Sequence, residues 1–295
     1  MAISQRAYDH TSDFSIVRNF IADIFFQKPT YQLWIPSRFE NSVFYDKDRS
    51  RHVRLWWDDD VLVGVVLVDP PNNITSILHN KFNHLLPKMI QWAEKTLINK
   101  STERDLEVFA YSLKDDIKRI SVLESLGYQF INESEHTQLR SNTDPLPEGS
   151  LPHGFYIKQI ESNDYDQFVN AIKMVFHHDR FTHEVFTEMR TAKFFKDDLL
   201  IGVFTNNGVL VAFAQQRVDE YKIIEFEPVG TIPGYRRKGL AKALMRESFI
   251  RAEKYTPKIF YVGGAPTEEA DRLYKSVGFT NMRIITRWSK KIHRD

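Results

Sequence analysis

Two successive stretches of the chain repeat the same order of hydrophobic and polar positions. Each starts with a short segment that predicts a strand, at residues 3–8 and 156–160, followed by polar helix caps and apolar residues at helical spacing. A hairpin follows in each stretch, with polar turns at residues 58–60 and 206–208. A predicted strand, helix, strand and helix come next, at residues 74–78, 83–98, 106–110 and 115–125 and again at 221–229, 239–255, 259–263 and 267–277.

The two stretches keep a constant spacing. Asp13 and Asp164 differ by 151 positions, and so do Gly127 and Gly278. Such register indicates a tandem duplication. Each copy is expected to be an α/β domain with a mixed, mostly antiparallel, twisted sheet flanked by helices, because hairpins are followed by strand–helix–strand crossovers. Polar residues, Pro and Gly cluster in the predicted linker 141–154, which separates domains at residues 1–140 and 155–295.

Composition narrows the functions that two such domains can have. The chain has 295 residues, of which 42% are hydrophobic, with 40 Lys and Arg against 39 Asp and Glu and no Cys. The absence of Cys excludes thiol nucleophiles and disulfides, and the net charge of +1 gives no overall attraction to nucleic acids or membranes. The longest apolar run, residues 61–68, is too short to span a bilayer and no apolar leader is visible, so we expect a soluble, cytoplasmic protein.

The segment of residues 229–241 carries the clearest chemical signal. A Pro-Gly pair ends a predicted strand, and Gly239 allows a tight turn into the helix that follows. The amide groups of the first helical turn have no intrahelical acceptor, so they face one point together with the positive end of the helix dipole. Three basic residues add formal charge at this point: Arg236, Arg237 and Lys238. A loop of this kind is suited to a pyrophosphate, although a solvated basic loop has the same composition.

Two patterns in the second copy resemble a known family. The sequence Arg236-x-x-Gly239-x-Ala241 after a strand is similar to the acetyl-CoA pyrophosphate loop of the GNAT superfamily of N-acetyltransferases, Gln/Arg-x-x-Gly-x-Gly/Ala. Residues 270–279 resemble the family's later pattern, Ala-x-x-Leu-Tyr-x-x-x-Gly-Phe. The resemblance covers residues 151–295 and implies a tandem GNAT protein. It also implies direct transfer of an acetyl group from acetyl-CoA to an amine, and we expect the primary amine of a small molecule as the acceptor.

The resemblance also implies roles for individual residues. Tyr274 matches the family's general acid, and Glu225 or Glu227 is the candidate base. In the family, a backbone N–H at the end of the strand donates to the thioester oxygen, which places this donor at residues 229–232 here. The implied contacts with acetyl-CoA are Val229, Gly230, Thr231, Ile232, Arg236, Arg237, Lys238, Gly239, Leu240, Ala241 and Thr267. Family members commonly carry Asn at the position of Thr267. The candidate contacts with the acceptor are His177, His178 and Trp34. The alternatives for the base are His177, His178 and His183.

The first copy lacks these features. Residues 78–85, where the loop would lie, contain no Gly, and Leu123 occupies the position that corresponds to Tyr274. We therefore expect a degenerate GNAT-like domain that shapes the acceptor pocket or stabilises the pair.

Several alternatives remain open at the level of sequence. The segment His177-His178-Asp179 does not have the ligand spacing of a helical metal site, so no metal is expected. A non-catalytic acyl-CoA sensor is the main alternative function. A tRNA-dependent aminoacyl transferase is disfavoured by the near-zero net charge and the complete loop. Both a monomer and a homodimer are compatible with the sequence.

Overall fold

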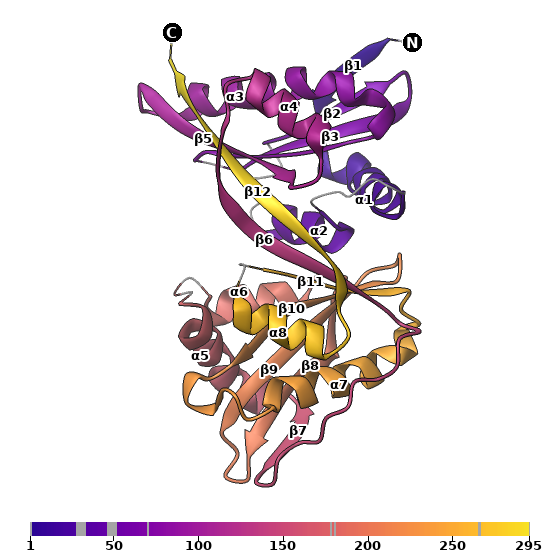
Figure 1. Ribbon diagram of the computed structural model, residues 1–295, viewed down its shortest axis with the longest axis vertical. Helices are drawn as coiled ribbons and strands as arrows, with labels where there is room; N and C mark the ends of the chain where they lie inside the picture. The colour runs from indigo at the N-terminus through magenta and orange to yellow at the C-terminus, as the bar shows by residue number, and fades with distance from the viewer. Residues whose placement is uncertain are drawn as a thin grey trace. The chain divides into compact units, whose positions relative to one another are not determined.

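The computed structural model in Figure 1 describes residues 2–27, 34–45, 52–69, 71–177, 179, 181–264 and 267–294. Contacts within the chain define two units: unit 1 comprises Met1–Glu135 with Arg283–Asp295, and unit 2 comprises His136–Met282. In the described ranges, no helix combines the length and the apolar character needed to span a membrane.

Unit 1 is a mixed sheet with helices on both faces. Its elements are β1 (Ile3–Ala7), α1 (His10–Phe26), α2 (Pro36–Tyr45), β2 (Val53–Asp58), β3 (Val61–Asp69), β4 (Asn73–Leu78), α3 (Leu86–Lys100), β5 (Asp105–Leu113), α4 (Ile117–Ser125), the start of β6 (Gln129–Ser141) and most of β12 (Thr280–His293). The strand order is β1-β2-β3-β4-β5-β12, with only β4 and β5 parallel. Met89 of α3 lies in the core on one face, and Phe39 of α2 lies in the core on the other.

Unit 2 repeats this arrangement. Its elements are the end of β6, β7 (Phe155–Gln159), α5 (Tyr165–Phe176), α6 (His183–Arg190), β8 (Phe195–Thr205), β9 (Leu210–Val218), β10 (Ile223–Thr231), α7 (Leu240–Ala252), β11 (Ile259–Gly264) and α8 (Glu268–Ser276). The strand order is β6-β11-β10-β9-β8-β7, with only β10 and β11 parallel. Alternate residues of β9 face opposite sides: Ala212 and Ala214 pack with Leu244 of α7, whereas the Phe213 ring lies 5.4 Å from that of Phe168 on α5.

These two sheets confirm the predicted fold class, but the units do not follow the domain boundaries expected at residues 140 and 155. From His136 onward, β6 pairs with β11 in unit 2, and from Ile285 onward β12 pairs with β5 in unit 1. The last strand of each copy therefore completes the sheet of the unit that is built mainly from the other copy. An alternating pattern predicts a strand but does not indicate its partner in the sheet. The predicted domain boundaries therefore place β6 in the domain of the first copy and β12 in the domain of the second.

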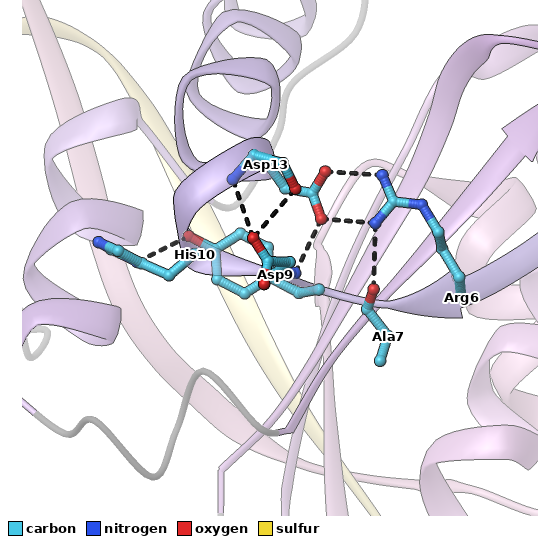
Figure 2. Close-up of polar contacts among 7 residues, drawn as sticks. Arg6, Ala7, Asp9, His10 and Asp13 are labelled. Atoms are coloured by element: carbon cyan, nitrogen blue, oxygen red, sulfur yellow. Dashed lines mark hydrogen bonds and ion pairs between the residues drawn. The ribbon is translucent and has the colours of Figure 1, made fainter.

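The duplication is also visible in a polar contact that both copies share. Arg6 binds the two carboxylate oxygens of Asp13 at 2.6 Å, and Asp13 accepts a hydrogen bond from the amide of Asp9 at 2.8 Å (Figure 2). In the second copy Lys158 contacts Asp164 at 2.6 Å, and Asp164 accepts a hydrogen bond from a backbone amide three residues earlier at 3.0 Å. Each pair ties the first strand of its copy to the start of the first helix. Hydrogen bonding to Arg6 lowers the pKa of Asp13.

Candidate functional site

The sheet of unit 2 opens between β10 and β11. The parallel pairing of these strands includes only Ile223 to Glu225 of β10. β10 continues to Thr231 and remains paired there with β9, after a register shift between Phe226 and Val229. Among the described residues, the last part of β10 therefore has a strand partner on one edge only.

Two backbone amides of β10 face this open edge. The amide of Ile232 donates to the carbonyl of Val211 on β9 at 2.9 Å. Since successive residues of an antiparallel strand direct their polar backbone groups to opposite edges, the amides of Val229 and Thr231 point away from β9. Residues 229–232 are the candidates from the sequence for the backbone donor to the thioester oxygen. The amides of Val229 and Thr231 face the open edge, whereas the amides of Gly230 and Ile232 face β9.

Gly230 has a packing role as well. A Cβ atom at this position would lie 2.3 Å from Cζ of Phe213, closer than real Cβ atoms approach other atoms. The Phe213 ring occupies this space below β10 and also contacts the ring of Phe176 at 6.1 Å. Glycine is needed here because of the ring, since Gly230 has no positive φ angle.

A turn of 3-10 helix, Pro233–Tyr235, leads from β10 into the expected pyrophosphate loop. Gly239 has a left-handed backbone with φ of 79°, and a Cβ atom there would meet nothing within 4 Å. Its carbonyl accepts the first intrahelical hydrogen bond of α7, from the amide of Ala243 at 3.1 Å. The amides of Leu240, Ala241 and Lys242 precede that bond, and no side chain caps the helix. The structure thus presents amide groups and open space at a positive helix end, which fits a pyrophosphate.

The basic residues of the loop are exposed. Arg236 Nε donates to the carbonyl of Thr231 at 3.1 Å, and the ammonium of Lys238 lies 5.2 Å from the centre of the Tyr235 ring. Arg237 has a positive φ of 62°. Arg236 therefore connects the loop to the open edge of β10, and the local charge at this end of α7 is positive.

Tyr274 lies on α8, which follows β11. Its ring is half-buried and packs edge-on against Phe279 with 5.9 Å between the ring centres. Burial, together with the negative charges of Glu227 and Asp271, raises the pKa of Tyr274 above its usual value. The hydroxyl is therefore protonated at neutral pH.

The two candidate bases have different environments. Glu225 is 1% exposed, and its Oε2 lies 3.5 Å from Nη1 of Arg217 directly across the strand pair. Glu227 is half-buried, lies within the register shift of β10 and acts electrostatically on Tyr274. The structure thus associates Glu227, rather than Glu225, with the tyrosine. The alternating pattern of the sequence did not indicate the register shift, which begins after Phe226 and includes Glu227 but not Glu225.

Thr267 is the N-cap residue of α8. Its hydroxyl oxygen accepts a hydrogen bond from the amide of Ala270 at 3.2 Å. The oxygen therefore stabilises the helix that carries Tyr274.

The residues expected to contact the acceptor belong to both units of the chain. His177 is exposed and ends α5 with a left-handed φ of 53°, and His183 forms an ion pair of 3.0 Å with Asp166. His178 lies outside the described residues. Trp34 belongs to unit 1, where it lines a pocket of about 420 Å³ that also contains Asp69, Tyr111 and Glu135. In the described part of the chain, no group of three His, Asp or Glu residues is arranged to hold a metal ion.

The sequence did not predict the contacts that β6 makes with α8. Nδ1 of His136 lies 2.8 Å from Oδ2 of Asp271, and Nε2 of Gln138 donates to Oδ1 of the same carboxylate at 3.0 Å. These contacts could be predicted only if the pairing of β6 with β11 were known, because His136 and Asp271 lie in different copies of the sequence.

Comparison with known proteins identifies similar sequences and folds. Residues 197–281 match the family model of the acetyltransferase (GNAT) domain. A GCN5-related N-acetyltransferase from Sphaerobacter thermophilus is 16% identical, with 99% of this chain and 96% of that chain covered and a TM-score of 0.74. A tandem GNAT protein from the clavulanic acid biosynthesis pathway is 10% identical, with 100% and 99% covered and a TM-score of 0.67.

A third solved structure is similar over the same extent. An acetyltransferase of the GNAT family from Colwellia psychrerythraea is 13% identical, with 98% of this chain and 100% of that chain covered and a TM-score of 0.63. No curated protein matches the chain. At these identities the solved structures establish the fold, over both copies.

Proposed function

Since residues 197–281 form a GNAT acetyltransferase domain within a tandem GNAT fold, we propose that unit 2 transfers an acetyl group from acetyl-CoA directly to the primary amine of a small molecule. One observation carries the proposal: the open edge of β10 leads directly into an uncapped helix N-terminus with open space above Gly239. A thioester arm and a pyrophosphate need these two features in this order.

The loop binds the pyrophosphate in this proposal. The amides of Leu240, Ala241 and Lys242 donate to phosphate oxygens, and the exposed basic side chains of the loop balance the charge. Gly239 leaves the approach to these amides unobstructed.

The open edge of β10 serves the thioester. Val229 or Thr231 donates its outward amide hydrogen to the thioester oxygen, on which negative charge develops as the amine attacks. These amides are fixed in the sheet before the reaction, so they need no reorganisation when the charge appears.

Two side chains move the protons. Glu227 accepts a proton from the ammonium form of the acceptor, directly or through water, which leaves a nucleophilic amine. The amine attacks the thioester carbon, the carbon–sulfur bond breaks, and Tyr274 donates its hydroxyl proton to the leaving thiolate. The nitrogen then loses its second proton as the amide forms, and this proton returns to the Tyr274 oxygen through water. Glu227 releases the first proton to solvent. Tyr274 is protonated before the reaction, because burial and the neighbouring carboxylates Glu227 and Asp271 raise its pKa above the usual tyrosine value. Positioned proton transfer of this kind is worth about 10²–10⁴ in rate.

The test measures binding and turnover separately. Calorimetry with acetyl-CoA should show binding, and a thiol assay should show CoA release with at least one of a panel of polyamines, amino acids, aminoglycosides and peptides. Binding without release for every amine would instead favour a non-catalytic acyl-CoA sensor. Absence of binding would refute both functions.

A further inference from the structure

Three alternate residues of β6 contact the helix that carries Tyr274. His136, Gln138 and Arg140 share one face of the strand because side chains alternate along it. His136 and Gln138 hold the two oxygens of Asp271 at 2.8 and 3.0 Å. Nε of Arg140 donates to the carbonyl of Val277 at 3.0 Å. We refer to these five residues as the clamp.

The clamp holds α8 at both ends. Asp271 lies in the first turn of the nine-residue helix and Val277 is its C-cap, so Tyr274 lies between the two points of attachment. Arg140 is 2% exposed, and its guanidinium lies 4.3 Å from the centre of the Phe249 ring on α7. The strand thus fixes α8 along its axis as well as against the sheet.

Unit 1 has the same fold, but other residues occupy the positions that correspond to His136, Gln138 and Asp271 of the clamp. At the spacing of 151 positions, Asp271 corresponds to Ile120 on α4, and His136 and Gln138 correspond to Arg287 and Ser289 on β12. Tyr274 corresponds to Leu123 in the same comparison. The carboxylate and the tyrosine are therefore both absent from the copy that lacks the pyrophosphate loop, whereas Arg287 and Ser289 still carry hydrogen-bond donors. The fold itself does not need the carboxylate or the tyrosine.

We propose that His136 and Gln138, which belong to the first copy in sequence, are positioning residues that act through Asp271 to place the Tyr274 hydroxyl for proton transfer. This proposal rests on the proposed function. Two donors on separate oxygens prevent rotation of the Asp271 carboxylate and shift of the helix turn that bears it. Position matters because a displacement of about 1 Å at a reacting group costs about 10²-fold in rate.

The experiment compares three variants of the full chain. His136→Leu removes one donor, and we expect kcat to fall about tenfold or more, while the dissociation constant of acetyl-CoA in calorimetry stays within about twofold because the loop is intact. His136→Asn keeps an N–H donor near the position of Nδ1 and should restore most of the rate. His293→Leu is the matched control, because His293 on β12 forms a similar pair with Asp105 at 2.7 Å and should leave kcat unchanged.

A double-mutant cycle tests the route of the effect. In a Tyr274→Phe background, His136→Leu should cause no further loss, since the group that it positions is gone. An equal loss in both backgrounds, or an unchanged kcat in His136→Leu, overturns the proposal. If His136→Leu does not fold, Gln138→Leu removes the other donor and takes its place in the cycle.

Hydrogen exchange separates this proposal from the proposed function. Without any substrate, His136→Leu should raise the exchange of α8 amides relative to wild type and leave those of α7 unchanged. If wild-type protein releases no CoA with any amine, the proposed function fails, and the exchange result still decides whether the clamp holds α8. Unchanged exchange in α8 overturns the clamp.

Discussion

Replacing Gly239 by Asp tests the pyrophosphate loop most directly. The residue has a φ of 79° and open space on its Cβ side, so the new carboxylate would project into the volume assigned to the phosphates. The carboxylate would also lie next to the amides of the first turn of α7, which are the groups proposed to bind the phosphates. We expect acetyl-CoA binding to be lost or weakened at least about 100-fold, on the magnitudes that follow.

The magnitude follows from charge and hydrogen bonding. Two unit charges about 4 Å apart repel by about 1 kcal/mol in water and by about 4 kcal/mol at an effective dielectric constant of about 20. Because the loop is exposed, the lower half of this range applies. Loss of one hydrogen bond from an amide to a phosphate adds about 1.5–3 kcal/mol. The sum exceeds about 2.5 kcal/mol, which is close to 100-fold in affinity.

Calorimetry with acetyl-CoA checks this value, and two controls isolate its causes. Gly208→Asp places the same side chain on another left-handed glycine of unit 2, with φ of 76° and open space, and should keep wild-type affinity. Gly239→Ala adds backbone strain without charge and should weaken binding less than the Asp variant. Wild-type affinity in Gly239→Asp would refute the assignment of the loop.

Other predictions concern the proton-transfer residues and the first copy. Tyr274→Phe should lower kcat about 10²-fold or more with little change in acetyl-CoA affinity, as steady-state kinetics and calorimetry would show; equal kcat would mean that another group protonates the thiolate. Glu227→Gln should lower kcat at neutral pH without loss of thermal stability. Glu225→Gln should instead lower the melting temperature, because it leaves Arg217 buried beside a neutral group. Asp13→Asn should cost about 1–2 kcal/mol in denaturant unfolding at pH 7. Folding lowers the pKa of Asp13, so its carboxylate stabilises the folded state above the usual aspartate pKa of about 3.9. This stabilisation is lost as the pH falls below that value. The unfolding free energies of the wild type and of Asp13→Asn should therefore converge in acid. A constant difference down to pH 2 would contradict this origin.

The sequence predicted the fold class because it depends on local patterns. Hydrophobic period, turn residues and a constant spacing of 151 positions are properties of short segments, and the spacing recurs in the structure, where Gly127 and Gly278 have φ angles of 88° and 89°. The sequence also indicated that Gly239 precedes a helix, because a glycine at this position, followed by apolar residues at helical spacing, is typical of a helix start without a side-chain cap. These features do not depend on which strands become neighbours.

Features that depend on strand pairing were not predictable in the same way. Glu225 lies in the paired part of β10 and Glu227 in its register shift, which a simple alternating pattern does not indicate. The clamp requires β6 to lie beside β11, and no local pattern near His136 indicates that neighbour. The Thr267 cap was visible as a helix-start residue, but the resemblance suggested a different role for the position.

The exchanged strands make the two copies interdependent. A break in the segment after Ser141 would separate residues 136–141 of β6 from their partner β11 in unit 2, and would remove β12 from its partner β5 in unit 1. Each fragment would expose an unpaired sheet edge, which favours aggregation. The same edges are complementary, so the two fragments should reassemble when they are produced together. Each copy therefore supplies one strand that the unit built mainly from the other copy needs to complete its sheet.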